Sequence, residues 1–385
     1  MRRCEIGIIG LGLMGSAALH ALARRGLDVL GFDPLEIGEA RGSSHGSCRV
    51  FRRFNFESEA YTALSDRAFE GWVALEAESG RRLLMPSPVL EAGPPGCQLV
   101  ANSRAAAVAA KTRITGPRNG REANLAFPAF KLPDDWDVVV QDSGAILLAE
   151  EAMRAFRGGA NGRIIRKAAR MRATSEGIRI SSASEEVMAE QVVVAAGPWI
   201  AELIPGLKRH VTVTRQAVGW FRPENPATTR YGEFPIFILE AERGMVYGFP
   251  DFEGRGVKAA QHDHGRVVSA DEWDPPASDA ELETVTATLA KLIPGADGPI
   301  VDRDICLYTN TAKADIVADN GNEFIIDRLP QDPRIIVASP CSGHGAKFAT
   351  AVGAMLADMA CDPALRTPEP FRIDRFSGFV DRPQE

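Results

Sequence analysis

Apolar runs and a helical pattern alternate over the first part of the chain. Residues 4–9 form a short run rich in β-branched side chains, which predicts a buried strand. Residues 16–25 carry small and apolar side chains at helical spacing, and Gly26 follows them as a helix-terminating glycine. A second apolar run at 27–32 predicts another strand, which ends at Asp33. The predicted order is strand, glycine-rich turn, helix, strand and acidic residue.

Similar runs recur far along the chain. Residues 143–148 lead into a helical pattern at 149–157, and the apolar run 334–339 precedes another helical pattern at 347–359. Residues 190–196 are apolar almost throughout, which is typical of a central strand in a parallel sheet. These segments predict one domain of sheet and helices that is assembled from both ends and the middle of the chain.

A different pattern fills the intervening segments. Seven prolines divide residues 86–133 into short pieces, which predicts mixed strands and loops. A helical pattern at 61–79 precedes these segments. Within them, Val211–Phe221 and Gly244–Phe249 alternate as antiparallel strands do, and a helical pattern covers 281–292. This material predicts a second domain built on a mixed or antiparallel sheet.

We therefore predict an α/β fold of two domains, without internal repeats. The first domain is discontinuous and comprises residues 1–85, 144–215 and 300–385. The second is inserted into it and comprises residues 86–143 and 216–299.

Composition narrows the class of protein. The 385 residues are 45% hydrophobic and 25% charged, which is ordinary for a globular protein and argues against disorder. The formal net charge is −7, and no block of like charges occurs. Non-specific nucleic-acid binders and membrane-surface proteins are usually basic, so neither class of partner is expected.

Membrane spans, leaders and disulfides are not expected either. No apolar run reaches the roughly 18 residues of a membrane-spanning helix. The apolar stretch 6–14 is broken by glycines and does not read as a signal peptide. Six cysteines without a C-x-x-C pair are too sparse for a disulfide scaffold, which predicts a reducing, cytoplasmic setting.

The glycine-rich turn has the pattern of a dinucleotide site. Gly10 permits a tight turn, Gly12 allows a pyrophosphate to approach the backbone, and Gly15 lets helix and strand pack closely. Asp33 can accept hydrogen bonds from ribose hydroxyls and disfavours a 2′-phosphate, so NADP is not expected. The motif does not separate FAD from NAD.

Cationic residues gather in two further motifs. Arg49, Arg52 and Arg53 follow the segment 42–48, and guanidinium groups bind carboxylates in a bidentate fork, although solvated surface arginines are the alternative. Lys258 and His262 share a face if their segment is a strand, although that face could equally be exposed.

The C-terminal third offers a cysteine and a glycine-rich turn. By itself Cys306 reads as a buried core cysteine. Glycines around His344 predict a turn that approaches a ligand, with Lys347 either as an anion-binding group or as a surface charge. No metal-ligand spacing, G-x-S-x-G or Walker pattern occurs, so neither a metal site nor a serine hydrolase is expected.

Taken in order, these motifs resemble the monomeric sarcosine oxidase and N-methyltryptophan oxidase family of D-amino-acid-oxidase-like FAD oxidoreductases. The last three motifs are together the most specific. The resemblance runs nearly end to end and rests on residues 10–15, 42–52, 195–199, 247–250, 257–262, 306–309, 324–327 and 342–348.

The resemblance implies a Rossmann-like FAD-binding domain with an inserted substrate domain, and a role for each matched residue. Cys306 falls where the family attaches FAD covalently, through a thioether to the flavin 8-methyl carbon. Arg52 and Lys347 match the positions that hold the substrate carboxylate, and Lys258 matches the position that promotes reaction with oxygen. The other implied positions are Arg49 and His262 near the flavin, Tyr247, Gly343 and His344 at the substrate, and Ser43, Gly345 and Lys347 along the cofactor.

The implied reaction is the oxidation of a secondary-amine amino acid by a monomeric enzyme. A hydride passes from the C–N bond to flavin, and reoxidation by O2 gives an imine and hydrogen peroxide. A dehydrogenase that uses another acceptor and a non-catalytic flavin-fold protein are the alternatives.

Some positions depart from the family pattern. Asn55 stands where sarcosine oxidases tend to carry Tyr, Cys341 stands for a Phe, Pro340 for a Gly, and Ile238 lies near an active-site Met. Smaller side chains suggest a roomier pocket, so a larger N-methyl or cyclic imino acid is as credible a substrate as sarcosine.

Overall fold

A parallel sheet forms the first half of the molecule. The computed structural model describes residues 1–57, 59–159, 163–272, 276–311, 323–376 and 379. Parallel pairing joins the five strands of its centre, and β17 pairs antiparallel at one edge. The strand order is β17 (Ile325–Leu329), β18 (Asp332–Ser339), β11 (Glu186–Val194), β1 (Arg2–Ile9), β2 (Val29–Phe32) and β8 (Ile164–Ile165), with the hairpin β9 (Ala169–Thr174) and β10 (Gly177–Ser182) attached to β11.

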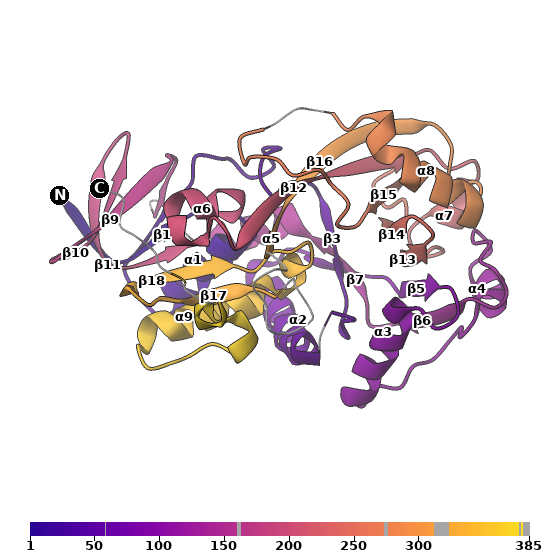
Figure 1. Cartoon of the computed structure of the whole chain (residues 1–385), viewed down its shortest axis with the longest axis horizontal. Coiled ribbons are helices and arrows are strands. Elements are labelled where there is room, and N and C mark those ends of the chain that lie inside the picture. The colour runs from indigo at the N-terminus through magenta and orange to yellow at the C-terminus, as the bar shows by residue number, and fades with distance from the viewer. Residues whose placement is uncertain (58, 160–162, 273–275, 312–322, 377–378, 380–385) are drawn as a thin grey trace.

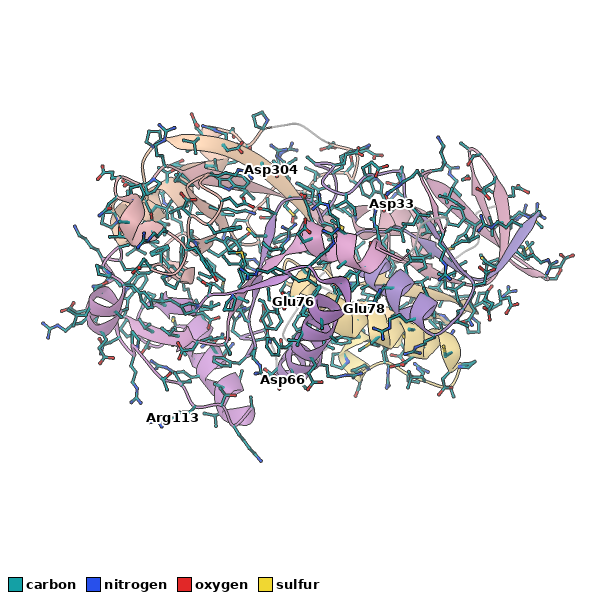
Figure 2. The ribbon with its side chains drawn as sticks, turned by 180° about the vertical axis from the view of Figure 1, so that it is seen from behind. Asp33, Asp66, Glu76, Glu78, Arg113 and Asp304 are labelled. Atoms are coloured by element: carbon teal, nitrogen blue, oxygen red, sulfur yellow. The ribbon has the colours of Figure 1, made fainter. Side chains whose placement is uncertain are left out.

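Four helices pack together beside this sheet (Figure 1). They are α1 (Leu13–Arg24), α2 (Glu59–Ser79), α5 (Ala149–Arg157) and α9 (Ala349–Cys361). Gly353 of α9 lies so close to α1 that a Cβ atom there would meet the Ala17 backbone at 2.7 Å. Figure 2 shows Glu76 and Glu78 near the end of α2, where Glu78 pairs with Arg24 of α1. Close backbone approach and ion pairing therefore fix α1 among its neighbours.

A seven-stranded mixed sheet forms the other half (Figure 1). All neighbours in it pair antiparallel except β5 and β13, which are parallel. The strand order is β16 (Ile300–Thr311), β12 (Val211–Phe221), β15 (Val257–Gln261), β14 (Gly244–Phe249), β13 (Ile236–Ala241), β5 (Val89–Gly93) and β6 (Asp137–Gln141).

Short elements complete the structure. Helix α8 (Asp279–Leu292) begins with a capping box between Ser278 and Glu281 and packs on β12 and β15. The remaining elements are the three-stranded sheet β3 (Cys48–Phe51), β7 (Ala145–Leu148) and β4 (Leu84–Pro86), and the helices α3 (Gln98–Ala109), α4 (Gly120–Ala126), α6 (Ile200–Leu203) and α7 (Pro226–Thr229). Among the described helices, none is both long and apolar enough to cross a membrane.

The predicted α/β class with two sheets is confirmed, and the division into domains stays a prediction. Strand β12 runs across the predicted boundary at 215/216 and lies wholly in the seven-stranded sheet. Strand β16 pairs with β12, although its residues were assigned to the first domain. Residues 211–215 and 300–311, which were assigned to the first domain, therefore lie in the seven-stranded sheet.

Candidate functional site

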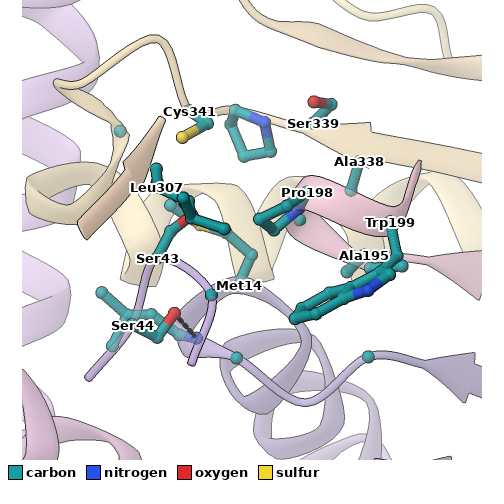
Figure 3. Close-up of a pocket in the computed structure, with 18 of the residues that line it drawn as sticks. Met14, Ser43, Ser44, Ala195, Pro198, Trp199, Leu307, Ala338, Ser339 and Cys341 are labelled. Carbon is teal, nitrogen blue, oxygen red and sulfur yellow. Dashed lines mark hydrogen bonds between the residues drawn. The ribbon is translucent and has the colours of Figure 1, made fainter. Parts of the chain in front are cut away.

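One long cavity of about 2110 Å³ runs between the two sheets. Ligand pockets commonly measure about 300–1,000 Å³, so this cavity has room for a dinucleotide and a second small molecule. Its wall includes the glycine-rich turn at one end and strands β12, β14 and β15 at the other. Figure 3 shows Ser44 and Met14 on one side of it and Ser339 and Cys341 on the other.

The glycine-rich turn has no room for side chains at its glycine positions. Gly10 has φ +90°, in the region that favours glycine. A Cβ at Gly15 would lie 1.8 Å from the Gly10 carbonyl oxygen, and one at Gly12 would lie 2.9 Å from Ser44 Oγ. The Ser44 hydroxyl accepts a hydrogen bond from Leu13 N at the start of α1 (Figure 3). Gly10 and Gly12 line the cavity at the start of α1, an arrangement that is compatible with a pyrophosphate close to the backbone.

Asp33 lies beside this turn and is held by the backbone. One carboxylate oxygen accepts a hydrogen bond from Leu11 N at 2.6 Å, and the other accepts one from Leu35 N at 2.8 Å. Burial raises the pKa of Asp33, while these hydrogen bonds oppose the rise. Asp33 lines the cavity beside the glycine-rich turn.

Arg157, which the motifs did not single out, braces the same turn. Its guanidinium donates to Ser16 Oγ at 2.9 Å and to the Leu11 carbonyl. Burial lowers its pKa to about 10. A basic residue at the end of the predicted helix 149–157 was the only sequence signal for this role.

Arg49 organises the loop that faces Cys306. The guanidinium donates to the carbonyl oxygens of Ser43 at 2.9 Å, His45 at 2.8 Å and Cys48 at 2.7 Å. Its Nη2 also lies 4.0 Å from Cys306 Sγ. Burial raises the pKa of the Cys306 thiol, and the neighbouring Arg49 opposes this rise. The structure thus brings Ser43, Arg49 and Cys306 together on the cavity wall.

Arg52 and Lys347 lie together as the sequence predicts, but two carboxylates accompany them. Arg52 donates to Glu57 Oε1, and Lys347 Nζ lies 3.7 Å from the same oxygen. Arg52 also donates to Glu91 Oε1 at 3.1 Å, and Gln141 donates to that oxygen at 3.2 Å. We call Arg52, Lys347 and Glu57 the anion subsite.

Charge and burial oppose each other in the anion subsite. Burial raises the pKa of Glu57, but Arg52 and Lys347 outweigh it and hold that pKa well below its ordinary range. Burial lowers the pKa of Lys347 to about 7, against the opposing charge of Glu57. Burial also raises the pKa of Glu91, although Arg52 lies beside it. Sequence reasoning missed both acids, although Glu91 is an acid in an otherwise apolar strand.

His344 and Gly343 form the turn after β18. The imidazole stacks on Phe324 with ring centroids 4.8 Å apart, and its Nδ1 lies 3.0 Å from Ser342 O. Burial lowers the pKa of His344 to about 3, so the ring is neutral. A Cβ at Gly343 would lie 2.3 Å from the Tyr308 ring, so only glycine fits there.

The remaining predicted residues lie on the second sheet. Tyr247, Lys258 and His262 all line the cavity. Lys258 Nζ donates to Cys48 Sγ at 3.5 Å, and burial lowers the pKa of His262. A Cβ at Gly345 would meet Pro340 O at 1.7 Å. Of the residues predicted for the site, all but Gly15 line one cavity, from the glycine-rich turn to these strands. Gly15 instead packs against the Gly10 carbonyl at the start of α1.

The four positions that depart from the family pattern differ in whether they reach the cavity. Ile238, Pro340 and Cys341 line it. Asn55 does not, because its side chain is buried elsewhere and donates to Arg53 O, Tyr61 O and Ser65 Oγ. In the described part of the chain, no group of three or more acidic, histidine or cysteine side chains could hold a metal ion.

Comparisons with known proteins agree with this geometry. Residues 5–359 match the DAO family, described as FAD dependent oxidoreductase. The chain is 28% identical over 368 residues to monomeric sarcosine oxidase of Bacillus sp. (strain B-0618), with 92% of each chain covered. It is 30% identical over 384 residues to N-methyl-L-tryptophan oxidase of Yersinia pestis (strain Pestoides F), covering 97% of this chain and 98% of that one. The solved structure of NikD, an unusual amino acid oxidase, has a TM-score of 0.82 at 18% identity with both chains fully covered.

Proposed function

The chain belongs to the DAO family of FAD-dependent oxidoreductases, and from this premise we propose that it oxidises a secondary amine that carries a carboxylate, with O2 as the electron acceptor. The observation that carries the proposal is the anion subsite, where Arg52 and Lys347 converge on one carboxylate oxygen inside the cavity. The names of two relatives, sarcosine oxidase and N-methyl-L-tryptophan oxidase, support the same substrate class.

The glycine-rich turn and Cys306 are the proposed anchors of FAD. Gly10, Gly12 and Gly15 would hold the pyrophosphate, and Asp33 would accept hydrogen bonds from a ribose. Cys306 would form a thioether with the flavin, beside Ser43 and Arg49 on the cavity wall. When bound, FAD supplies the two-electron acceptor that takes a hydride equivalent from the C–N bond and passes the electrons to O2, giving an imine and hydrogen peroxide.

Glu57 takes the place of a substrate carboxylate in the anion subsite. A charged ligand group would therefore displace Glu57 and take over its contacts with Arg52 and Lys347. Guanidinium and ammonium groups together fix both the position and the orientation of a carboxylate. The α-carbon and the amine of the substrate are then held in one place, which favours the reaction by orientation.

Neutral imidazoles complete the substrate end of the cavity. His344 is neutral at physiological pH, and burial lowers the pKa of His262 in the same direction. A neutral ring can accept a hydrogen bond from an N–H group, whereas an imidazolium would repel a charged amine. These residues, with Tyr247 and Gly343, are the proposed contacts of the amine.

An anaerobic bleaching screen tests the proposal. The holoenzyme is mixed without oxygen with sarcosine, larger N-methyl amino acids, pipecolate and proline, and with the matching amines that lack a carboxylate. We expect the flavin absorbance to bleach with at least one amino acid and to bleach far more slowly with its decarboxylated match. Equal rates for both would contradict the role of the anion subsite, and no bleaching with any of them would contradict the substrate class.

The choice of acceptor is tested in air. One hydrogen peroxide per amine oxidised is expected from the purified protein. Turnover that requires an added dye and gives no peroxide would instead support a dehydrogenase.

A further inference from the structure

Lys258 lies between two aromatic residues because of the sheet register. Strand β15 lies between β14 and β12, and Lys258 is paired directly with Phe249 on one side and Trp220 on the other. Directly paired residues in an antiparallel sheet project from the same face. The register therefore places one aromatic ring on each side of this lysine.

Both rings are within reach of the ammonium group. Lys258 Nζ lies 5.1 Å from the Trp220 ring centroid and 5.6 Å from the Phe249 ring centroid. Cations within about 6 Å of an aromatic centroid are attracted by the ring quadrupole. The side chain is only 8% exposed, and among the described residues no carboxylate lies within ion-pair distance of Nζ. The two rings and Cys48 Sγ are its close neighbours.

Trp220 is itself fixed in place. Arg255 Cζ lies 4.2 Å from the same ring centroid, and Arg255 forms an ion pair with Asp302. Trp220 is 3% exposed and Phe249 is 1% exposed, so neither ring has room to turn away. The lysine is thus packed against a rigid aromatic wall.

This surrounding differs from that of the two cations of the anion subsite. Arg52 and Lys347 face carboxylates, which offset their charge. An aromatic ring stabilises a cation but carries no net charge, so the two rings do not offset the charge of Lys258.

We propose that Trp220 and Phe249 are positioning residues that hold the Lys258 ammonium in one place for the reaction of reduced FAD with O2. In that step two electrons and two protons pass to O2 and give hydrogen peroxide. The fixed ammonium stabilises the negative charge that develops on oxygen. The inference rests on the proposed function, in which Lys258 promotes this step.

A stopped-flow experiment tests the inference without a known substrate. The holoenzyme is reduced anaerobically with dithionite and mixed with O2, and the return of flavin absorbance is followed. We expect W220L and F249L each to slow reoxidation about tenfold, and W220F to stay within about twofold of wild type. F221L is the matched control, because Phe221 is the next residue in β12 and packs in the core beside α8 on the other face.

Lysine NMR gives a second readout that does not depend on turnover. The chain contains eight lysines, so protein labelled with 13C at lysine Cε gives few signals, and the Lys258 signal is the one absent from K258R. Ring currents from two aromatic faces move this signal upfield. W220L and F249L are expected to return it toward the position of an exposed lysine, and F221L is expected to leave it in place.

The outcomes separate this inference from the proposed function. If K258M is reoxidised at the wild-type rate, the role of Lys258 itself is wrong. If K258M is slow but W220L and F249L match wild type in both rate and Lys258 signal, the positioning role is overturned. If W220L gives no folded protein, F249L decides by the same two readouts.

Discussion

Glu57 determines how much positive charge the anion subsite offers to a ligand. Its carboxylate is shared by Arg52 and Lys347, whereas Glu91 pairs with only the first of these two cations and is fully buried. Glu91 is further held by Gln141 and by its place in the middle of β5. We therefore infer that Glu91 stays paired with Arg52 when a ligand binds and that Glu57 is the partner that a ligand would displace.

Replacing Glu57 by Gln should tighten the binding of a substrate carboxylate. E57Q keeps the size of the side chain but removes the charge that competes for Arg52 and Lys347. We expect KM for an amino-acid substrate to fall about tenfold, which corresponds to about 1.4 kcal/mol, and Tm to fall because two buried cations lose a partner. Steady-state kinetics measure this, with the decarboxylated amine as control, since its KM should not change. An unchanged or higher KM for the amino acid would show that Glu57 does not compete.

Lys347 should give substrate binding a pH dependence near neutrality. Its pKa is lowered to about 7, so its charge is present below that pH and is lost above it. KM for a carboxylate substrate is expected to rise as pH increases through about 7. The unfolded lysine keeps its proton up to about pH 10.4, so this residue also makes the folded state less stable at pH 7 than at pH 9.

Arginine at position 347 is the matched control for this titration. K347R keeps a positive charge across the whole range, because a guanidinium does not lose its proton in this range. The rise in KM above pH 7 should then disappear, even if KM itself is higher. A rise that persists in K347R would come from another group, such as the substrate amine.

The sequence predicted the cations of the site but not their partners. Arg52 and Lys347 lie in recognisable motifs, each with fixed local spacing. Glu91 contacts Arg52 only in the folded chain, where the pairing of β5 with β13 and β6 places it beside the arginine. Glu57 is close in sequence to Arg52, but its contact with Lys347 also depends on the fold. Such contacts between distant segments leave no periodic signal, and an isolated acid in an apolar strand was the only trace.

Among the elements, α9 shows how packing sets the limits of a helix. A helix was expected to begin at residue 347, but Gly345–Phe348 forms a 3₁₀ turn and α9 begins at Ala349. The tight turn follows from Gly345, where a Cβ would meet Pro340 O. Helical spacing alone could predict the body of this helix but not the irregular turn before it.

The contact between α9 and α1 predicts an unusual sign for a glycine replacement. Helix propensity alone predicts that G353A stabilises the protein by about 1 kcal/mol. The new Cβ would meet the Ala17 backbone at 2.7 Å, so we instead expect a loss of about 1–3 kcal/mol and a lower Tm. G159A is the control, because a Cβ there meets nothing within 4 Å. A Tm at or above that of wild type in G353A would show that the helices can move apart.

At the scale of the whole molecule, residues from both sheets line the cavity that is proposed to hold the cofactor. The glycine-rich turn belongs to the first sheet, whereas Cys306 lies in β16 of the second. A thioether at Cys306 would therefore keep the flavin with the protein after unfolding. Acid precipitation of the wild type should leave a yellow pellet, and precipitation of C306S should release the flavin into the supernatant. Release from the wild type would contradict covalent attachment.

FAD should also stabilise the C306S protein as a whole. At a concentration about 100 times its Kd, a ligand that binds only the folded state contributes about 2.7 kcal/mol. Flavin-free C306S is expected to gain several degrees in Tm when FAD is added, measured by differential scanning fluorimetry. ADP, which lacks the flavin, is the control and should give a smaller rise. No rise with FAD would contradict a cofactor that connects both sheets.

If a substrate carboxylate displaces Glu57 as proposed, the tethered carboxylate of Glu57 would also make the protein selective among the anions of a cell. A group attached through a short segment competes at an effective concentration in the millimolar range. Chloride, phosphate or a simple carboxylic acid at lower concentration gains nothing beyond the charge contact and so loses this competition. Only a ligand whose remaining atoms also bind the cavity would then displace Glu57. Competition from Glu57 would thus weaken the binding of small anions to Arg52 and Lys347 and so limit inhibition by common metabolites.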